Sequence, residues 1–180
     1  MRAVFLDRDG TINEDSVGYI SKITDFKLFP FAAEAITIFN KLDFKTIVVS
    51  NQSGIERGFF TETDLNIIHN YMITELQKEN AFIDLILYSP FLNHFTRKPE
   101  PGMFFQALQH FNFNANQSFM IGDKMSDIEF GKKNGLITFL VKTGEGCKTL
   151  DMIENNKVKP DFVVENILSA ANVIKLYFNP

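Results

Sequence analysis

Short runs of apolar residues recur along the chain, and they are nearly continuous rather than alternating with polar positions. The six runs occupy residues 3–6, 46–50, 83–88, 118–122, 137–141 and 161–164. Their many β-branched residues favour strands, and continuous apolar runs are typical of strands that are covered on both faces. The pattern therefore predicts six strands in a parallel sheet.

Between these runs lie segments whose apolar residues have the three- and four-residue spacing of amphipathic helices. These segments occupy residues 31–42, 62–80, 101–111, 127–134 and 166–177. Helix-end signals accompany them, namely a capping-box spacing at Thr61 and Asp64, Pro101 near a first turn, and Gly135 after a last turn. Strands alternating with helices predict an α/β fold with a doubly wound, Rossmann-like parallel sheet.

The length of 180 residues suits one domain with its own core. The chain has no repeat, low-complexity tract or linker, so we expect a single domain over residues 1–180. Segment 13–28 is long and polar for a connection, and we expect it to form a flap over a site.

Composition narrows the classes of partner. The net charge of −4 and the pI of about 5.4 argue against a nucleic-acid-binding surface. No run reaches the roughly 20 apolar residues of a membrane span, and the early charges at Asp7, Arg8 and Asp9 argue against a signal peptide. We therefore expect a cytoplasmic monomer without a membrane or nucleic-acid partner. The single cysteine, Cys147, excludes an internal disulfide and any multi-cysteine zinc site.

Polar side chains cluster after four of the expected strands. In doubly wound sheets, ligands bind beyond the carboxyl ends of the strands, so we expect these clusters to meet at one edge. The clusters are Asp7-Arg8-Asp9-Gly10-Thr11, Ser50-Asn51-Gln52-Ser53-Gly54, Arg97-Lys98-Pro99, and Gly122-Asp123-Lys124 with Asp127 one turn later.

The clusters combine carboxylates with donors for an anion. Asp7, Asp9 and Asp123 would surround one small volume, where their mutual repulsion calls for a hard cation. Mg²⁺ prefers a few carboxylates together with water and a phosphate, and Ser50 and Lys98 supply donors to such an anion. This combination indicates phosphoryl transfer. One aspartate can then attack phosphorus while a second acid protonates the leaving oxygen.

Four segments resemble, in order, the four motifs of haloacid dehalogenase (HAD) superfamily phosphatases. They are DRDGT at 7–11, VVSNQSG at 48–54, RKP at 97–99 and GDKMSD at 122–127. The longer stretches FLDRDGTIN, SNQSGIERGFF, RKPEPGM and IGDKMSDIEFG resemble D,D-heptose 1,7-bisphosphate phosphatases and the related histidinol phosphatases. The resemblance implies an HAD-type fold without a large cap domain.

The resemblance also implies a role for individual residues. It implies Asp7 as the nucleophile and Asp9 as the general acid and later the base. Ser50 and Lys98 would be the catalytic residues that hold the transferring phosphoryl group. The Mg²⁺ ligands would be Asp7, Asp9 through its backbone oxygen, and Asp123, with Asp127 behind them. Substrate contacts, besides those of Ser50 and Lys98, would come from Asp15, Gly18, Tyr19, Asn51, Gln52, Ser53, Arg97 and Lys124.

The implied reaction is Mg²⁺-dependent removal of the 7-phosphate of D-glycero-D-manno-heptose 1,7-bisphosphate through an aspartyl phosphate. Lipopolysaccharide or capsule heptose synthesis is implied in the same way. Histidinol phosphate or another sugar phosphate is the alternative substrate. A phospho-receiver domain is the non-enzymatic alternative, but it needs an aspartate at the end of the third strand, where Tyr88-Ser89-Pro90 stands.

One departure from the family concerns zinc. The subfamily often carries a Cys-x-His … Cys-x-Cys loop before its Arg-Lys-Pro motif. The corresponding residues 88–96 hold His94 and no cysteine, so they cannot form a tetrahedral zinc site and we expect no zinc. Because that loop would line the pocket, its loss leaves the choice of substrate open.

Overall fold

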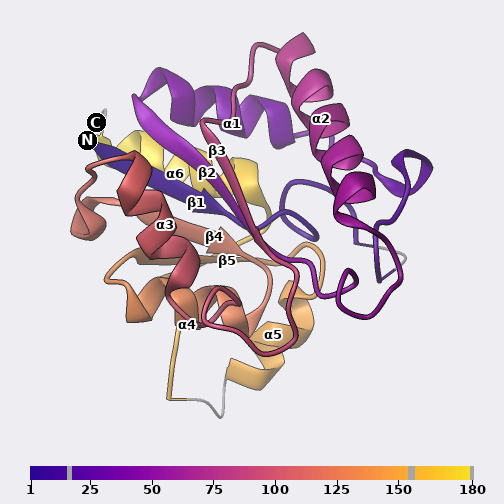
Figure 1. Ribbon diagram of the computed structural model, residues 1–180. Coiled ribbons are helices and arrows are strands. Elements are labelled where there is room, and N and C mark those ends of the chain that lie inside the picture. Colours follow the sequence, from indigo (N-terminus) through magenta and orange to yellow (C-terminus); the bar gives the residue numbers. More distant parts are fainter. Residues whose placement is uncertain (16–17, 154–156, 179–180) are drawn as a thin grey trace.

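The centre of the structure, a computed structural model that describes residues 1–15, 18–153 and 157–178, is a six-stranded sheet. All neighbouring strands are parallel, and the order is β3-β2-β1-β4-β5-β6 (Figure 1). The strands are β1 (Arg2–Leu6), β2 (Phe44–Asn51), β3 (Leu85–Ser89), β4 (Phe119–Gly122), β5 (Ile137–Val141) and β6 (Phe162–Val164). The predicted doubly wound α/β sheet is confirmed.

The side chains of successive residues in β1 face opposite sides of the sheet. Val4 and Leu6 belong to one apolar core, whereas Ala3 and Phe5 belong to the other. All four side chains are fully buried. Because side chains alternate along a strand, burial on both faces produces the continuous apolar run seen in the sequence.

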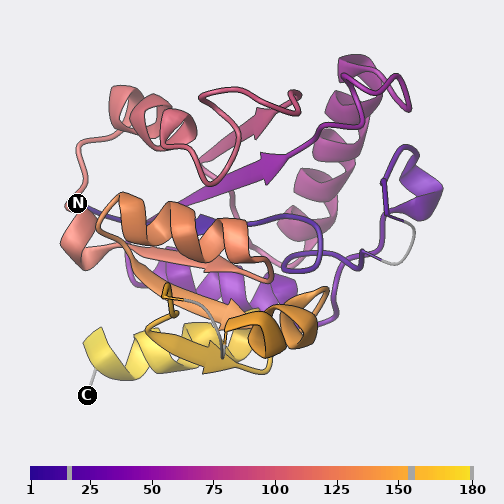
Figure 2. The same ribbon diagram turned by 90° about the horizontal axis from the view of Figure 1, so that it is seen from below.

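Helices cover both faces of the sheet (Figure 1, Figure 2). The face that includes Val4 carries α1 (Ala32–Lys41), α2 (Glu62–Lys78) and α6 (Ile167–Phe178). The opposite face carries α3 (Gly102–His110) and α4 (Met125–Lys133), and α5 (Gly146–Ile153) adds a small apolar cluster beside α4. Sequence analysis missed α5, which has only eight residues and begins with glycine.

The residues predicted to begin or end helices lie at the ends of the observed helices. The Thr61 hydroxyl accepts the Asp64 N–H, and the Asp64 carboxylate accepts the Thr61 N–H, which completes the capping box of α2. Gly135 follows α4 with a φ of +72°, a conformation that glycine adopts at little cost. α4 begins at Met125 rather than at Asp127, because the Asp127 carboxylate accepts the Lys124 N–H at 3.0 Å and caps the helix.

The direction of winding reverses at β1. The chain proceeds from β1 to β2 and β3 on one side, and then crosses back to β4, which lies on the other side of β1. Ligands bind in the crevice at such a reversal. The residues that directly follow β1 and β4 are Asp7 and Asp123, so the topology alone places two carboxylates at this crevice.

The connections above this crevice are loops. Among the described residues, the segments from β1 to α1 and from β2 to α2 contain no inserted cap domain. Segment 13–28 folds back on itself, since the Glu14 N–H donates to the Lys27 carbonyl at 2.9 Å and Asn13 pairs with Leu28. None of the described helices is long and apolar enough to cross a membrane.

The aromatic core on the α3–α4 face generates a stability prediction. The Phe5 ring is fully buried, with its centroid 5.4 Å from Phe113 and 6.1 Å from Phe130. Phe5→Ala should lower the free energy of unfolding by about 3–5 kcal/mol, because it removes apolar contacts and leaves a cavity. Denaturant unfolding measures the change.

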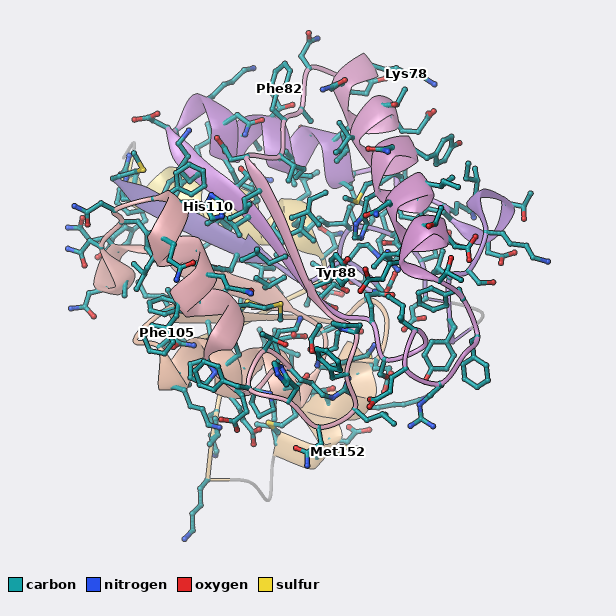
Figure 3. All side chains as sticks on the ribbon, in the orientation of Figure 1. Lys78, Phe82, Tyr88, Phe105, His110 and Met152 are labelled. Atoms are coloured by element: carbon teal, nitrogen blue, oxygen red, sulfur yellow. The ribbon has the colours of Figure 1, made fainter. Side chains whose placement is uncertain are left out.

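The matched control is Phe82→Ala. The Phe82 ring is 53% exposed and lies at the periphery of the molecule (Figure 3). Its removal should change the free energy of unfolding by no more than about 0.5 kcal/mol. Equal losses for the two variants would contradict the placement of Phe5 in the core.

Candidate active site

Asp7 is fixed at the crevice by the sheet itself. It is the first residue beyond β1, and its N–H still donates to the Ile121 carbonyl of β4 at 2.9 Å. This hydrogen bond extends the pairing of the two central strands by one residue. The Asp7 carboxylate is buried, and its Oδ1 lies 2.6 Å from the Lys98 ammonium.

The Lys98 ammonium is a buried cation that contacts three oxygens. Its Nζ lies 2.6 Å from Asp7 Oδ1, from Asp127 Oδ1 and from the Val49 carbonyl oxygen. Burial alone would lower the pKa of Lys98, but the charges of Asp127 and Asp7 outweigh burial and raise the pKa above its usual value. Lys98 is therefore charged, and its charge partly neutralises the surrounding carboxylates.

Asn51 fixes the backbone of Lys98. Its amide Nδ2 donates to the Lys98 carbonyl at 3.0 Å, and its Oδ1 accepts the Lys98 N–H at 2.9 Å. These reciprocal bonds join the end of β2 to the loop that carries the lysine. Asn51, predicted to contact substrate, thus uses its side-chain amide to position Lys98, while it also lines the cavity at the site.

Three carboxylates form a compact acidic cluster. One oxygen each of Asp7, Asp123 and Asp127 lies within 4.8 Å of the others, and all three residues are buried. Burial, followed by the charges of Asp7 and Asp127, raises the pKa of Asp123 well above its usual value. Burial also raises the pKa of Asp127, although the Lys98 charge opposes it.

The acidic cluster fits a hard divalent cation. Asp123 Oδ1 is buried and has no hydrogen-bond partner among the described residues. A buried oxygen without a partner is costly, and a cation beside it would remove this cost. Oxygen ligands from a few carboxylates are the set that Mg²⁺ uses in phosphoryl-transfer sites.

The loop after β5 positions Asp123, a function that sequence analysis missed. The Glu145 N–H donates to Asp123 Oδ2 at 2.8 Å, and the Thr143 hydroxyl donates to the Gly10 carbonyl at 2.6 Å. Gly144 has a φ of +57°, and a Cβ there would lie 2.2 Å from Asp123 Oδ2. The sequence feature that could have indicated this loop is Gly144, which lies three residues after the end of the predicted strand at 137–141.

The Asp9 carboxylate accepts four hydrogen bonds. Oδ1 accepts Arg8 Nε and Asn13 Nδ2, both at 2.9 Å, and Oδ2 accepts Arg8 Nη2 and Gln52 Nε2, both at 2.8 Å. Burial would raise the pKa of Asp9, but the Arg8 charge and the hydrogen bonds together lower it below its usual value. Asp9 is therefore held ionised.

Gln52 and Ser53 follow Ser50 at the end of β2, and all three side chains are buried. Gln52 Nε2 donates to Ser50 Oγ at 2.7 Å as well as to Asp9. Gln52 therefore links the predicted phosphoryl-binding hydroxyl to the predicted acid. The Ser53 carbonyl accepts the Arg57 N–H, so this residue also shapes the turn of its loop.

One small cavity is lined by seven of the fourteen predicted site residues, and Asp123 is not among them. The volume of the cavity is about 30 Å³, whereas one water molecule needs about 10–15 Å³, so the cavity suits an ion or a few small groups rather than a whole sugar. Ser126 lines it too, although sequence analysis did not single this residue out. The lining residues are Asp7, Asp9, Ser50, Asn51, Lys98, Lys124, Ser126 and Asp127.

Lys124 connects the cavity with segment 13–28 through Asp15. Its Nζ lies 3.1 Å from Asp15 Oδ2 and 3.5 Å from Glu145 Oε1. Burial would lower the pKa of Lys124, but the charges of Asp7, Asp123 and Asp15 outweigh it and raise the pKa. Burial raises the pKa of Asp15, against the opposing charge of Lys124. Lys124 is one-third exposed, which leaves part of its charge accessible from outside.

Tyr19 is 37% exposed, and its ring lies 4.9 Å from the Phe59 ring, measured between centroids. Gly18 before it is exposed, with a φ of +78°. The predicted substrate-contact stretch 15–19 also includes Ser16 and Val17, which lie outside the described residues.

The loop between β3 and α3 is held by contacts within the protein. Arg97 Nη1 donates to the Phe91 carbonyl at 3.1 Å, and His94 Nδ1 lies 2.8 Å from Thr96 Oγ1. The Glu56 carboxylate accepts the Leu92 N–H. Residues 88–96 supply one imidazole and no thiolate, so they do not fit a tetrahedral zinc site. The absence of zinc stays a prediction.

Comparison with known sequences agrees with this geometry. Residues 95–170 match the HAD-hydrolase-like family. The D-glycero-D-manno-heptose-1,7-bisphosphate 7-phosphatase of Chlorobaculum tepidum is 35% identical, covering 94% of this chain and 92% of that protein. The D-glycero-beta-D-manno-heptose-1,7-bisphosphate 7-phosphatase of Pasteurella multocida is 36% identical, covering 97% of each.

Solved structures agree as well. The D,D-heptose 1,7-bisphosphate phosphatase from B. bronchiseptica, complexed with magnesium and phosphate, matches with a TM-score of 0.91 and 28% identity over 98% of this chain and 99% of that chain. The corresponding enzyme from Burkholderia thailandensis matches with a TM-score of 0.74 and 26% identity over 96% and 97%. With its acidic cluster, buried lysine and matching length, the chain belongs to the D-glycero-D-manno-heptose-1,7-bisphosphate 7-phosphatase family, a group of HAD-like phosphoric monoester hydrolases.

Proposed function

We propose that this protein hydrolyses the 7-phosphate of D-glycero-D-manno-heptose 1,7-bisphosphate, using Mg²⁺ and an aspartyl phosphate on Asp7. The observation that carries the proposal is the buried contact of Asp7 and Asp127 with Lys98, beside the unpaired oxygen of Asp123. The names of relatives that match nearly the whole chain support the choice of substrate. The proposal treats residues 1–180 as one catalytic domain, active as a cytoplasmic monomer without zinc.

The chemistry proceeds in two displacements at phosphorus. The Asp7 carboxylate attacks, an acyl-phosphate bond forms, and the bond from phosphorus to the sugar oxygen breaks. Asp9, which is ionised in the absence of substrate, first takes up a proton from solvent or from the phosphate monoanion, and it then gives this proton to the departing sugar oxygen. Asp9 then takes a proton from the water that cleaves the acyl phosphate, which returns Asp7 to its starting state. Lys98 and Ser50 hold the phosphoryl oxygens through both steps.

Asp7, Asp123 and the backbone oxygen of Asp9 would hold Mg²⁺, with Asp127 beside them. The bound ion supplies positive charge that offsets the carboxylates and the phosphoryl oxygens. Lys98 supplies a second positive charge next to Asp7, through its 2.6 Å contact with Oδ1. Asp127 positions that ammonium through its own 2.6 Å contact.

The sugar would lie outside the small cavity, because about 30 Å³ admits little more than the reacting group. Lys124 lines the cavity and Asp15 lies 3.1 Å from it, so these two side chains mark one side of the opening, and we expect Arg97 and Tyr19 to contact the sugar as well. The partly exposed charge of Lys124 suits a substrate that carries a second phosphate. This charge favours a bisphosphate over histidinol phosphate, whose amine is a cation.

Removal of the nucleophile gives the first test of mechanism. Asp7→Asn should abolish phosphate release, because an amide cannot form the acyl phosphate. Phosphate release with Mg²⁺ and the heptose bisphosphate measures activity, and mass spectrometry of the rapidly quenched enzyme detects the phosphorylated protein. Asp151→Asn, at an exposed carboxylate on α5, is the matched control and should keep both signals. Turnover retained in Asp7→Asn would refute the covalent route.

A panel of phosphate esters tests the substrate. The panel holds both anomers of D-glycero-D-manno-heptose 1,7-bisphosphate, histidinol phosphate, fructose 1,6-bisphosphate and a nucleoside monophosphate, each with Mg²⁺ and with EDTA. One heptose anomer should have the largest kcat/KM, and EDTA should remove the activity. A higher kcat/KM for histidinol phosphate would overturn the proposed substrate while leaving the phosphatase mechanism intact.

Metal binding should also raise the melting temperature. A ligand at 100 times its Kd stabilises the folded state by about 2.7 kcal/mol, and here it would also relieve the repulsion around Asp123. Differential scanning fluorimetry with and without Mg²⁺ measures the shift. Asp123→Asn should largely remove the shift, and Asp151→Asn should keep it. A full shift in Asp123→Asn would place the cation elsewhere.

A further inference from the structure

Arg8 is a fully buried arginine that stands between the two catalytic aspartates in sequence. It is 0% exposed and is the largest fully buried side chain of the described residues. Arginine is almost never fully buried unless it is paired. The chain leaves the strand at Leu6, and the N–H groups of Ile12 and Asn13 donate to the Arg8 carbonyl at 2.8 and 3.2 Å. These bonds close a tight turn at Arg8 directly after β1.

The guanidinium of Arg8 contacts both oxygens of the Asp9 carboxylate. Nε donates to Oδ1 at 2.9 Å and Nη2 donates to Oδ2 at 2.8 Å. Two parallel bonds from a rigid fork fix the carboxylate plane, which the point charge of a lysine cannot do. Asn13 and Gln52 each add one further bond to the same carboxylate. Arg8 therefore sets the plane of Asp9, and the two amides secure it.

His69 contacts the remaining side of the guanidinium. Its Nε2 lies 3.2 Å from Arg8 Nη1, and its ring is buried on the face of α2 that packs against the core. Burial, followed by the Arg8 charge, lowers the pKa of His69 to about 3, so the ring is neutral and Nε2 can accept a hydrogen bond. α2 thereby holds the far end of Arg8 in place through an uncharged acceptor.

We propose that Arg8 and His69 are positioning residues: Arg8 aims the Asp9 carboxylate at the leaving oxygen, and His69 holds Arg8 in that orientation. This inference rests on the proposed function, because it assigns a task to the acid of that mechanism. A purely structural role would instead make Arg8 a buried ion pair that closes the turn after β1, with no effect on the geometry of proton transfer.

The two roles differ in how the leaving group matters. A sugar alkoxide is a strong base and needs a proton as it departs, so its release depends on a well-placed acid. p-Nitrophenolate is a weak base and departs without one. Misplacing Asp9 should therefore slow release of the sugar and spare the first release of p-nitrophenolate. General disruption of the site would slow both.

The experiment compares wild type with Arg8→Lys on both kinds of ester, with Mg²⁺ present. For the heptose bisphosphate, kcat should fall by about 10²-fold, the lower range of what a positioned acid contributes. For p-nitrophenyl phosphate, stopped-flow absorbance should show a burst close to one p-nitrophenolate per enzyme, with a rate near that of wild type. The following steady state should be slow, because Asp9 also acts as the base that completes hydrolysis.

A second pair of variants tests His69 without removing a buried charge. His69→Phe keeps a ring but loses the acceptor, and it should lower kcat for the heptose bisphosphate about tenfold while sparing the burst. His69→Gln supplies an amide oxygen as acceptor and should recover most of that loss. His110→Phe, at an exposed histidine on α3 (Figure 3), is the control and should match wild type.

Each result decides the proposal. A selective loss with the sugar ester, together with rescue by His69→Gln, supports it. Equal losses with both esters, or wild-type kcat in Arg8→Lys, would overturn it. If Arg8→Lys does not fold, as judged by its melting temperature, the His69 pair decides in the same way. Wild-type enzyme that releases no phosphate from any ester with Mg²⁺ would instead refute the proposed function, and that measurement precedes the variants.

Discussion

The Lys98 ammonium lies between Asp7 and Asp127, 2.6 Å from an oxygen of each, in a crevice that shields all three side chains from solvent. Removing one partner of such a buried contact leaves an uncompensated charge, which typically costs about 3–5 kcal/mol. The rest of the site is arranged around this contact. Asp7 comes from the end of β1 and Asp127 from the first turn of α4. The Val49 carbonyl accepts from the ammonium, and Asn51 fixes the lysine backbone.

Much of this arrangement can be predicted from the sequence, because the apolar runs locate the strands and the strands locate the edge of the sheet where ligands bind. Strands buried on both faces require continuous apolar runs, and a doubly wound sheet brings the residues after those runs to one edge. Asp7 and Asp123 follow from that rule alone. The cavity residues Ser50 and Lys124 agree with the same rule, since Ser50 lies at the end of β2 and Lys124 lies two residues after β4, whereas Lys98 reaches the cavity from a longer loop after β3.

What the sequence does not reveal depends on side-chain direction within loops. The sequence gives no role to Arg8, and only the structure shows that its guanidinium is fully buried against Asp9. Asn51 is predicted to contact the substrate, but its side-chain amide forms two hydrogen bonds with the backbone of Lys98. Helix α5 has only eight residues, so its apolar spacing is too short to distinguish it from a loop in the sequence.

The reciprocal bonds between Asn51 and Lys98 have a consequence for how this family diversifies. They attach the lysine to the rigid end of β2, so its position does not depend on the preceding loop. That loop can then change in length or in its contacts, such as the stacked rings of Phe95 and Phe105, without moving the ammonium. Substitutions in the loop before Lys98 can therefore alter contacts with the substrate while the position of the catalytic lysine stays the same.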